Sequence, residues 1–305
     1  MGTPEFALPS LGNLREAGHR ILAVVTRPDR PRGRGGKLTE TPVKRAAREA
    51  GIPVLTPERL DAEFREALLA IKPEIVVTVA YGRLLPPWLL EFPSAVAALN
   101  VHASLLPAYR GAAPIQRAIM AGETRTGITV MYMDRGLDTG DILRQAALDI
   151  LPGETSGELS GRLALLGSAL LRDSLDLLVA GAAPRIAQAA EGVSLAPPLA
   201  RDEEEISWDK SAVEVVRLIR ALSPHPAAWT RTIDGKILKI WQARLVDGQA
   251  GVNVPGEVLG GEGIRVATGK GVVRLTKVQP AGGRAMEDLA YLRGTLLPPG
   301  SILGR

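Results

Sequence analysis

The apolar run Ile75-Val-Val-Thr-Val-Ala80 constrains the fold more strongly than any other stretch of the chain. β-Branched residues dominate it and charged residues are absent, so neither face of a strand built from it suits water. Strands that are buried on both faces occur in parallel sheets that helices cover on both sides. This run therefore predicts an α/β fold for the part of the chain around it.

Short apolar runs alternate with amphipathic segments through the first 180 residues. This alternation is typical of βα units and predicts a Rossmann-like domain with a mostly parallel sheet. The stretch 28–37 is rich in Gly, Pro and Arg, so we expect it to be an exposed loop. The expected helices are 4–17, 42–50, 62–71, 86–91, 113–121 and 156–180, and the expected strands are 21–26, 54–55, 75–80, 95–99, 128–133 and 141–150.

A different pattern follows residue 205, where a helix expected over 211–222 precedes short strands between Gly-rich turns. That spacing predicts a small, OB-like β-barrel. We therefore expect a catalytic domain over 1–180, a linker over 181–205 with a short strand near 185–187, and a second domain over 206–305. The expected barrel strands are 227–233, 237–245, 256–259, 263–267 and 272–278.

The first residues carry a helix-start signal without a preceding strand. Thr3-Pro4 has the form of an N-cap followed by proline at the first helical position. A βα unit needs a strand before such a helix. We therefore expect a short apolar strand to belong immediately upstream of Gly2.

Composition narrows the kinds of chemistry that are open to the chain. It contains no cysteine, which excludes disulfides, thiolate nucleophiles and Cys-based metal sites. Its three histidines (His19, His102 and His225) are not spaced as a ligand pair, so we expect no metal. Neither a signal peptide nor an apolar run of membrane-spanning length is present, which favours a cytoplasmic, soluble protein without a membrane partner.

Positive charge is concentrated in two regions. Residues 27–48 hold eight Lys and Arg against two acids, and residues 206–305 hold fourteen against eight. The net charge of the chain is only +4. Clustering of this kind is what a nucleic-acid-binding surface requires, while a merely solvated basic surface remains the alternative.

Asn100, His102 and Asp138 are the candidate catalytic residues. Asn100 and His102 stand at the end of the expected strand 95–99, and Asp138 follows another strand-like run. The C-terminal ends of strands face the ligand crevice in open α/β sheets, so the three side chains are expected to meet there. Taken singly, each has a structural alternative: Asn100 as a turn cap, His102 as a buried structural histidine and Asp138 as an Asx-turn residue.

The motifs around these residues resemble those of the formyltransferases that use 10-formyltetrahydrofolate. The resemblance rests on Asn100-x-His102-x-Ser-Leu-Leu-Pro-x-Tyr-Arg-Gly111 and Leu137-Asp-Thr-Gly-Asp141. Three further motifs point to the branch of that family that acts on methionyl-tRNA, and the resemblance runs over nearly the whole chain. They are Gly2-Thr-Pro-x-Phe6, Arg27-Pro-Asp29 and Gly111-Ala-Ala-Pro-Ile-Gln116.

The resemblance implies a set of binding residues. Its folate-binding loop corresponds to Ser104, Leu105, Leu106 and Pro107, which would offer backbone groups and an apolar wall to the pterin. Tyr81 and Gly82, at the end of the neighbouring strand, are assigned to the same ligand. Relatives carry a basic loop that contacts the acceptor end of tRNA, and Arg34 and Lys37 occupy its position here.

The expected reaction is transfer of the formyl group of 10-formyltetrahydrofolate to the amino group of methionyl-initiator-tRNA, by a chain that we expect to be a monomer. An amide and an imidazolium suit the oxyanion of such a reaction, and a carboxylate can accept a proton. Formylation of another amine, glycinamide ribonucleotide or an amino sugar, is one alternative. A non-catalytic RNA-binding protein on the same scaffold is another.

Overall fold

The computed structural model describes residues 1–32, 36–92, 96–246 and 253–304. Two units of structure are present. The first comprises residues 1–114, 125–149 and 160–197, and the second comprises 115–124, 150–159 and 198–305. Residues 181–197, expected as part of a linker, belong to the first unit.

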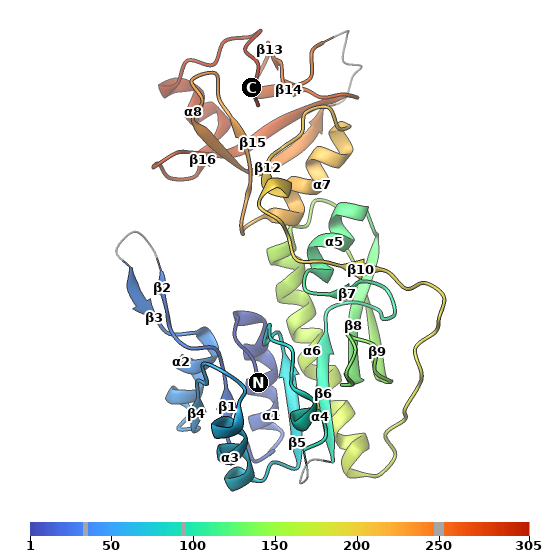
Figure 1. Ribbon diagram of the computed structural model, residues 1–305. Coiled ribbons are helices and arrows are strands. Elements are labelled where there is room, and N and C mark those ends of the chain that lie inside the picture. The colour runs from blue at the N-terminus through green and yellow to red at the C-terminus, as the bar shows by residue number, and fades with distance from the viewer. Residues whose placement is uncertain (33–35, 93–95, 247–252, 305) are drawn as a thin grey trace. The chain divides into compact units, whose positions relative to one another are not determined.

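A four-stranded sheet forms the centre of the first unit (Figure 1). Its order is β5 (Ile75–Val79), β6 (Ala97–His102), β8 (Arg125–Tyr132) and β9 (Ile142–Asp149). β5 and β6 run parallel, whereas the pairs β6–β8 and β8–β9 are antiparallel. A separate parallel pair joins β1 (Val24–Val25) and β4 (Val54–Leu55). The expected α/β class is confirmed, with antiparallel pairing on one side of the sheet.

Two helices of the first unit begin directly after a side-chain N-cap. The Thr41 hydroxyl accepts a 3.1 Å hydrogen bond from the main-chain N–H of Lys44, and Pro42 occupies the first turn of α2. Asp61 caps α3 in the same way. The helices are η1 (Glu5–Ala7), α1 (Leu8–Glu16), α2 (Pro42–Glu49), α3 (Ala62–Ile71), α4 (Pro87–Leu90) and most of α6 (Ser156–Val179).

α6 and an aromatic cluster cover the sheet. A Cβ on Gly167 of α6 would lie 3.1 Å from Cγ1 of Val101 on β6, so the missing side chain permits close packing there. Phe64, Trp88 and Phe92 stack with ring centroids 6.1 and 6.4 Å apart. Val76, Thr78 and Val79 of β5 are buried, whereas Ile75 and Val77 are half-buried.

The expected cap at Thr3 is wrong. The helical segment starts as a 3₁₀ turn at Glu5, and Pro4, whose side chain makes no capping bond, precedes it. The Thr3 hydroxyl instead donates a 3.3 Å hydrogen bond to the carbonyl of Tyr81, which is 78 residues away in the sequence. The preference of threonine for the N-cap position does not decide the outcome here, because folding brings the Tyr81 carbonyl within reach of its hydroxyl.

Met1 and Gly2 lie between β1 and β5. The Gly2 N–H donates to the carbonyl of Val25 at 2.9 Å, and the Val79 N–H donates to the carbonyl of Met1 at 2.9 Å. Gly2 thus pairs in parallel with Val79. The Met1 ammonium donates to the carbonyl of Val77 at 2.5 Å, and its burial lowers the pKa of this amine to about 5.

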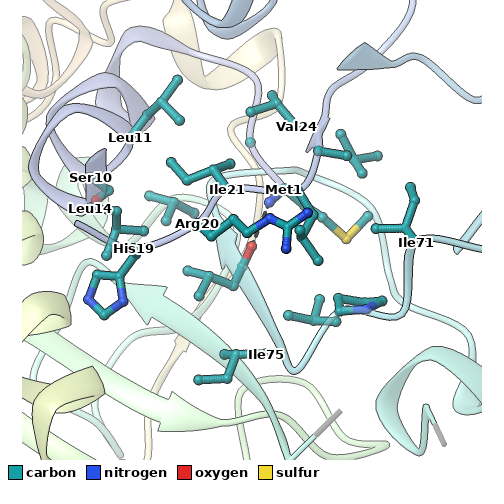
Figure 2. A pocket seen from close by; sticks show the side chains of 18 of the residues that line it. Met1, Ser10, Leu11, Leu14, His19, Arg20, Ile21, Val24, Ile71 and Ile75 are labelled. Carbon is teal, nitrogen blue, oxygen red and sulfur yellow. Dashed lines mark hydrogen bonds between the residues drawn. The ribbon is translucent and has the colours of Figure 1, made fainter. Parts of the chain in front are cut away.

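A mostly apolar cavity of about 490 Å³ continues from this point between the segment 21–25 and β5 (Figure 2). Ile21, Ile71 and Ile75 border it, and Leu11 and Leu14 reach it from α1 (Figure 2). The expected strand 21–26 is confined to Val24–Val25, because β4 pairs with only these two residues. A strand forms only where a neighbour completes its hydrogen bonds.

The basic stretch 28–37 contains a hairpin rather than a plain loop. β2 (Arg30–Arg32) pairs antiparallel with β3 (Lys37–Thr39). The base is anchored by an ion pair of 2.6 Å between Asp29 and Lys44. The expected loop is therefore wrong for residues 30–32 and 37, which lie in paired strands, because two short strands can pair with each other at an exposed site.

The second unit is a curled antiparallel sheet with α7 (Ala212–Leu222) packed on it. Ser211 and Glu214 form a reciprocal capping box at the start of α7, worth about 1 kcal/mol. The Trp208 Nε1 donates a 3.0 Å hydrogen bond to Thr230, so its polar end is satisfied inside the core. The strands are β11 (Ala228–Arg231), β12 (Ile237–Val246), β15 (Val272–Pro280), β14 (Ile264–Ala267) and β13 (Val258–Leu259), in sheet order.

Two elements near the end of the chain were not expected from the sequence. β16 (Met286–Glu287) pairs with β15, and α8 (Asp288–Gly294) follows it. Arg274 binds the buried Asp288 at 2.8 Å and ties this end to the sheet. No helix in the described part of the chain has the length and hydropathy that a membrane crossing needs.

Candidate active site

Asn100 and His102 lie two residues apart at the C-terminal end of β6. Side chains alternate between the two faces of a strand, so both project to the same side of the sheet. Asn100 pairs with Thr78 on β5 and with Met131 on β8. Its position is therefore fixed from both sides.

Asp138 reaches the same place from the loop between β8 and β9. Its main chain is in the left-handed region, with φ at 52°. Oδ1 of its carboxylate accepts a hydrogen bond of 3.4 Å from Nδ2 of Asn100, and Oδ2 lies 3.6 Å from Nδ1 of His102. The structure thus brings the three predicted side chains together.

These three groups differ in their access to solvent. The His102 side chain is 6% exposed, and Asp138, whose side chain is 15% exposed, is half-buried like Asn100. The main-chain N–H of Gly111 donates a further bond of 2.9 Å to Oδ2 of Asp138. Asn100 and Asp138 are therefore the more accessible members of the three, and His102 is the most enclosed.

The imidazole ring of His102 is oriented by the backbone. Nε2 lies 2.9 Å from the carbonyl of Tyr109, and because a carbonyl only accepts, Nε2 carries a proton. Nδ1, facing Asp138, then bears a proton only when the ring is an imidazolium. This pairing can bind and release one proton at Nδ1 beside the carboxylate.

The loop Ser104–Pro107 follows β6 directly and is held by neighbouring groups. Thr129 donates to the carbonyl of Ser104 at 2.7 Å, and Gln145 donates to that of Leu106 at 2.8 Å. Ser104 and Leu106 are buried, while Leu105 and Pro107 are half-buried. Of the four residues, Leu105 and Pro107 are the ones that have apolar surface left for a ligand.

Tyr81 and Gly82 stand at the end of β5, but their groups are not equally available. The Tyr81 side chain is buried in the core, and this burial raises its pKa. Arg27 donates through Nε to the carbonyl of Tyr81 at 3.2 Å and through its terminal nitrogen to that of Gly82. A contact of the Tyr81 ring with folate is thereby disfavoured, which leaves the exposed backbone of Gly82 as the candidate.

The two residues assigned to tRNA are placed only in part. Arg34 lies outside the described residues. Lys37 begins β3 and pairs with Arg32 through its backbone, and its side chain is likewise outside what the structure describes.

Several residues at the site were missed by sequence reasoning, because they lie in the segment expected to be a linker. β10 (Leu195–Ala196) pairs in parallel with β7 (Arg110–Gly111), next to Asp138. The Ser194 hydroxyl accepts a bond of 2.9 Å from the main-chain N–H of Tyr109. Gln188 contacts both Arg110 and the main chain of Asp138. The Ala- and Pro-rich composition of this segment carries no periodicity that would signal these contacts.

Comparison with known proteins places this geometry in a family. The family model described as formyl transferase matches residues 1–175, and that described as the formyl transferase C-terminal domain matches residues 198–296. The methionyl-tRNA formyltransferase of Pelotomaculum thermopropionicum is 48% identical over all of this chain and 97% of its own. That of Moorella thermoacetica is also 48% identical, over all of this chain and 98% of its own.

A solved structure shares the fold at lower identity. It is the N-formyltransferase from Helicobacter canadensis in complex with folinic acid and dTDP-3-aminofucose, at 20% identity and a TM-score of 0.66. The likeness covers 90% of this chain and 97% of that one. Since both family models match, and the matching relatives align with the whole chain, this chain belongs to the formyl transferase family.

Proposed function

We propose that this protein transfers the formyl group of 10-formyltetrahydrofolate to the free amino group of methionyl-initiator-tRNA. The observation that carries the proposal is the contact of Asn100, His102 and Asp138 at the end of β6, in a chain 48% identical to methionyl-tRNA formyltransferases along its full length. As an enzyme of translation initiation it would act in the cytoplasm, and we expect it to act as a monomer.

The chemistry required is an acyl transfer between two nitrogens. The amine nitrogen of the methionyl group forms a bond to the formyl carbon, and the bond from that carbon to N10 of the folate breaks. In between, the carbonyl oxygen carries negative charge, and one proton moves from the attacking nitrogen to the leaving one. The site must therefore stabilise an oxyanion and handle a proton.

Asn100 is suited to stabilise the oxyanion by donating a hydrogen bond from its amide. Asn100 is only half-buried, and its amide nitrogen donates a hydrogen bond of 3.4 Å to Asp138. A preorganised donor at a developing oxyanion is typically worth about 3–4 kcal/mol of transition-state stabilisation. We assign this role to Asn100, with an imidazolium at His102 adding positive charge next to it.

Asp138 and His102 are suited to proton transfer. The carboxylate lies beside the imidazole nitrogen that changes its protonation, so this pair can take a proton from the attacking amine, directly or through water, and pass it to the leaving N10. Gly111 and Asn100 donate to the same carboxylate, which keeps it aligned when its charge changes. No covalent nucleophile is needed for this reaction.

The loop after β6 fits a folate in its chemistry. Its carbonyls are anchored by Thr129 and Gln145, so the loop is preorganised, and Leu105 and Pro107 present apolar surface that a pterin ring would cover. A relative of the same fold was crystallised with folinic acid, which supports a folate as the formyl donor. The exposed main chain of Gly82 is assigned to the same ligand.

The tRNA is assigned to the two basic regions. The hairpin β2–β3 projects from an anchored base, and its exposed Arg30 adds to the cations of 27–48. Arg34 and Lys37 are the proposed contacts of the acceptor end. The basic second unit would supply further phosphate contacts.

Formylation of an amino sugar is the competing activity, since the relative from Helicobacter canadensis was crystallised with an amino sugar nucleotide. At 20% identity that relative does not decide which amine this chain formylates, whereas relatives at 48% identity carry the name methionyl-tRNA formyltransferase. A non-catalytic RNA-binding role is disfavoured by the intact contact of the three polar side chains.

The test supplies the purified protein with 10-formyltetrahydrofolate and one amine at a time: methionyl-initiator-tRNA, methionyl-elongator-tRNA, glycinamide ribonucleotide or a dTDP-amino sugar. We expect formylmethionyl-tRNA from the initiator substrate, and a much lower rate with the elongator. Tetrahydrofolate should form in equal amount. Formylation of a small amine in the absence of formylation of tRNA would overturn the proposal.

A further inference from the structure

Gln188 stands out in the segment that follows α6. From residue 184 to residue 195 every side chain is exposed except that of Gln188, which is half-buried. The segment lies in the first unit and is held to it at Ile186, which pairs with Ile142, and at β10. A polar side chain that is partly shielded from water needs hydrogen-bond partners in the protein.

The amide of Gln188 makes four hydrogen bonds. Nε2 donates to the main-chain carbonyls of Asp138 and Gly140, each at 2.8 Å. Oε1 accepts from Nε of Arg110 at 3.1 Å and from Nη2 of Arg110 at 2.7 Å. The opposite orientation of the amide would set its N–H groups against a guanidinium and its oxygen against two carbonyls, so these partners define which atom is which.

The loop that Gln188 holds has few buried side chains, and outside Asp138 its distant contact is the ion pair of Arg135 with Glu91 at 2.7 Å. Residues 134–139 are exposed apart from half-buried Asp138, and Asp134 supplies only local bonds, to Gly136 and Thr139. Asp138 itself sits at a φ of 52°, in the left-handed region that a residue with a side chain adopts only at an energetic cost. External bonds to its main chain offset that cost and keep the residue in place.

We propose that Gln188 is a positioning residue that holds the carboxylate of Asp138 in register with His102 and Asn100. Its amide joins the carbonyls of Asp138 and Gly140 to Arg110, the residue before Gly111, whose N–H binds the Asp138 carboxylate. Main chain and side chain of Asp138 are thereby tied to adjacent residues of β7. This inference rests on the proposed function, because it assigns Gln188 a role in the same site.

The chemistry of the proposal requires an amide at this position. A carboxylate in its place keeps an acceptor for Arg110 but sets an oxygen against two carbonyls. Gln188→Glu therefore breaks the tether to the Asp138 loop and preserves the one to Arg110. Gln188→Ala breaks both.

The test measures formylation of methionyl-tRNA by the full-length variants, with kcat and KM for both substrates. We expect both substitutions at Gln188 to lower kcat by roughly 10- to 100-fold, as displaced supporting groups do, with KM for folate and tRNA changed by less than about two-fold. Glu191→Ala, in an exposed part of the same segment, is the control and should retain wild-type rates and the wild-type melting temperature.

A cycle with Asp138→Asn separates positioning from a general structural role. If Gln188 acts through Asp138, then adding Gln188→Ala to Asp138→Asn changes the single-turnover rate by less than about two-fold. A loss in that background equal to the loss in the wild type would overturn the proposal, and so would wild-type kcat in Gln188→Glu. If wild-type protein formylates no tRNA, the proposed function fails instead, which is a distinct result.

Discussion

The main-chain N–H of Gly111 donates a 2.9 Å hydrogen bond to Oδ2 of Asp138. Gly111 has a φ of 127°, and a Cβ at this position would lie 2.6 Å from the carbonyl oxygen of Ala196 on β10. Glycine is required here twice, by the backbone conformation and by the close approach of the paired strand. The same residue thus joins β7 to β10 and orients the carboxylate.

Gly111→Ala should therefore lower both stability and activity. We expect a loss of about 1–3 kcal/mol in the free energy of unfolding, because the new methyl group displaces β10, together with a lower kcat. Denaturant titration and initial rates measure the two effects. Gly12→Ala is the matched control, because a Cβ there meets no atom within 4 Å in the interior of α1, and it should stabilise the protein by about 0.5–1 kcal/mol. Unchanged stability of Gly111→Ala would contradict this reading of β7.

His102→Ala should reduce turnover by roughly two to four decades without unfolding the protein, since it removes one half of the proton-binding pair. Asp138→Asn should have a comparable effect, because it keeps the shape of the side chain and removes its charge. The double variant should be little slower than either single one, as expected of residues that act as a unit. Turnover of His102→Ala within a few-fold of the wild type would refute the role of this residue.

Replacement of Arg34 and Lys37 by Ala should weaken tRNA binding and reduce its dependence on salt. Each phosphate contact that is lost lowers the slope of log K against log salt by about 1, through counterion release. Folate binding should not change. Arg65→Ala, an exposed cation on α3 outside the basic regions, is the control. A salt slope equal to that of the wild type would mean that the hairpin does not touch the tRNA backbone.

The ion pair between Arg117 and Glu203 should make the stability of the protein sensitive to acid. Hydrogen bonds from the Arg117 guanidinium, followed by one from the main chain of Ala200, lower the pKa of Glu203 to about 2 from its usual 4.5. Because the folded pKa is the lower one, the stabilisation is present above about pH 5 and is lost as pH falls from 5 toward 2.

Glu203→Gln should therefore be less stable than the wild type at pH 7 and approach it at pH 2–3. The Glu203 side chain is 37% exposed, so solvent screens the pair and we expect a coupling of about 0.5–1 kcal/mol. Denaturant titrations at several pH values measure the difference. In an Arg117→Met background the substitution should have a smaller effect at pH 7, and an equal effect in both backgrounds would exclude the ion pair as its cause.

Addition of six apolar residues before Met1 should raise the melting temperature and the activity. The added segment would run beside β5 from the parallel pair Gly2–Val79 into the cavity of about 490 Å³ shown in Figure 2, and would pair with the segment 21–25 on its other side. It would also replace the buried amine of Met1 by an amide, whose N–H can donate to the carbonyl of Val77 without placing a charge in the interior.

A six-residue Gly/Ser extension is the control for that experiment, since it offers the same backbone but nothing to fill an apolar cavity. We expect it to give a smaller gain or none. Equal melting temperatures and rates for the 305-residue chain and the apolar extension would show that the cavity does not accept a strand.

The sequence by itself determined the elements whose side chains repeat with a clear period. The β-branched composition of β5 predicted a strand there, the helical segments expected over 42–50 and 62–71 are α2 and α3, and the strand-end positions of Asn100 and His102 predicted that they lie at one sheet edge. These features depend on neighbours within a few residues, so local chemistry is sufficient to specify them.

Only the tertiary structure decided which distant groups become partners. It took the Thr3 hydroxyl from a helix cap to the carbonyl of Tyr81, buried the Tyr81 ring that was assigned to folate, and turned Gln188 from an exposed segment onto the Asp138 loop. Each of these contacts joins residues about fifty or more positions apart. Their formation depends on which surfaces the packed sheet and helices leave facing one another, and no local pattern encodes that.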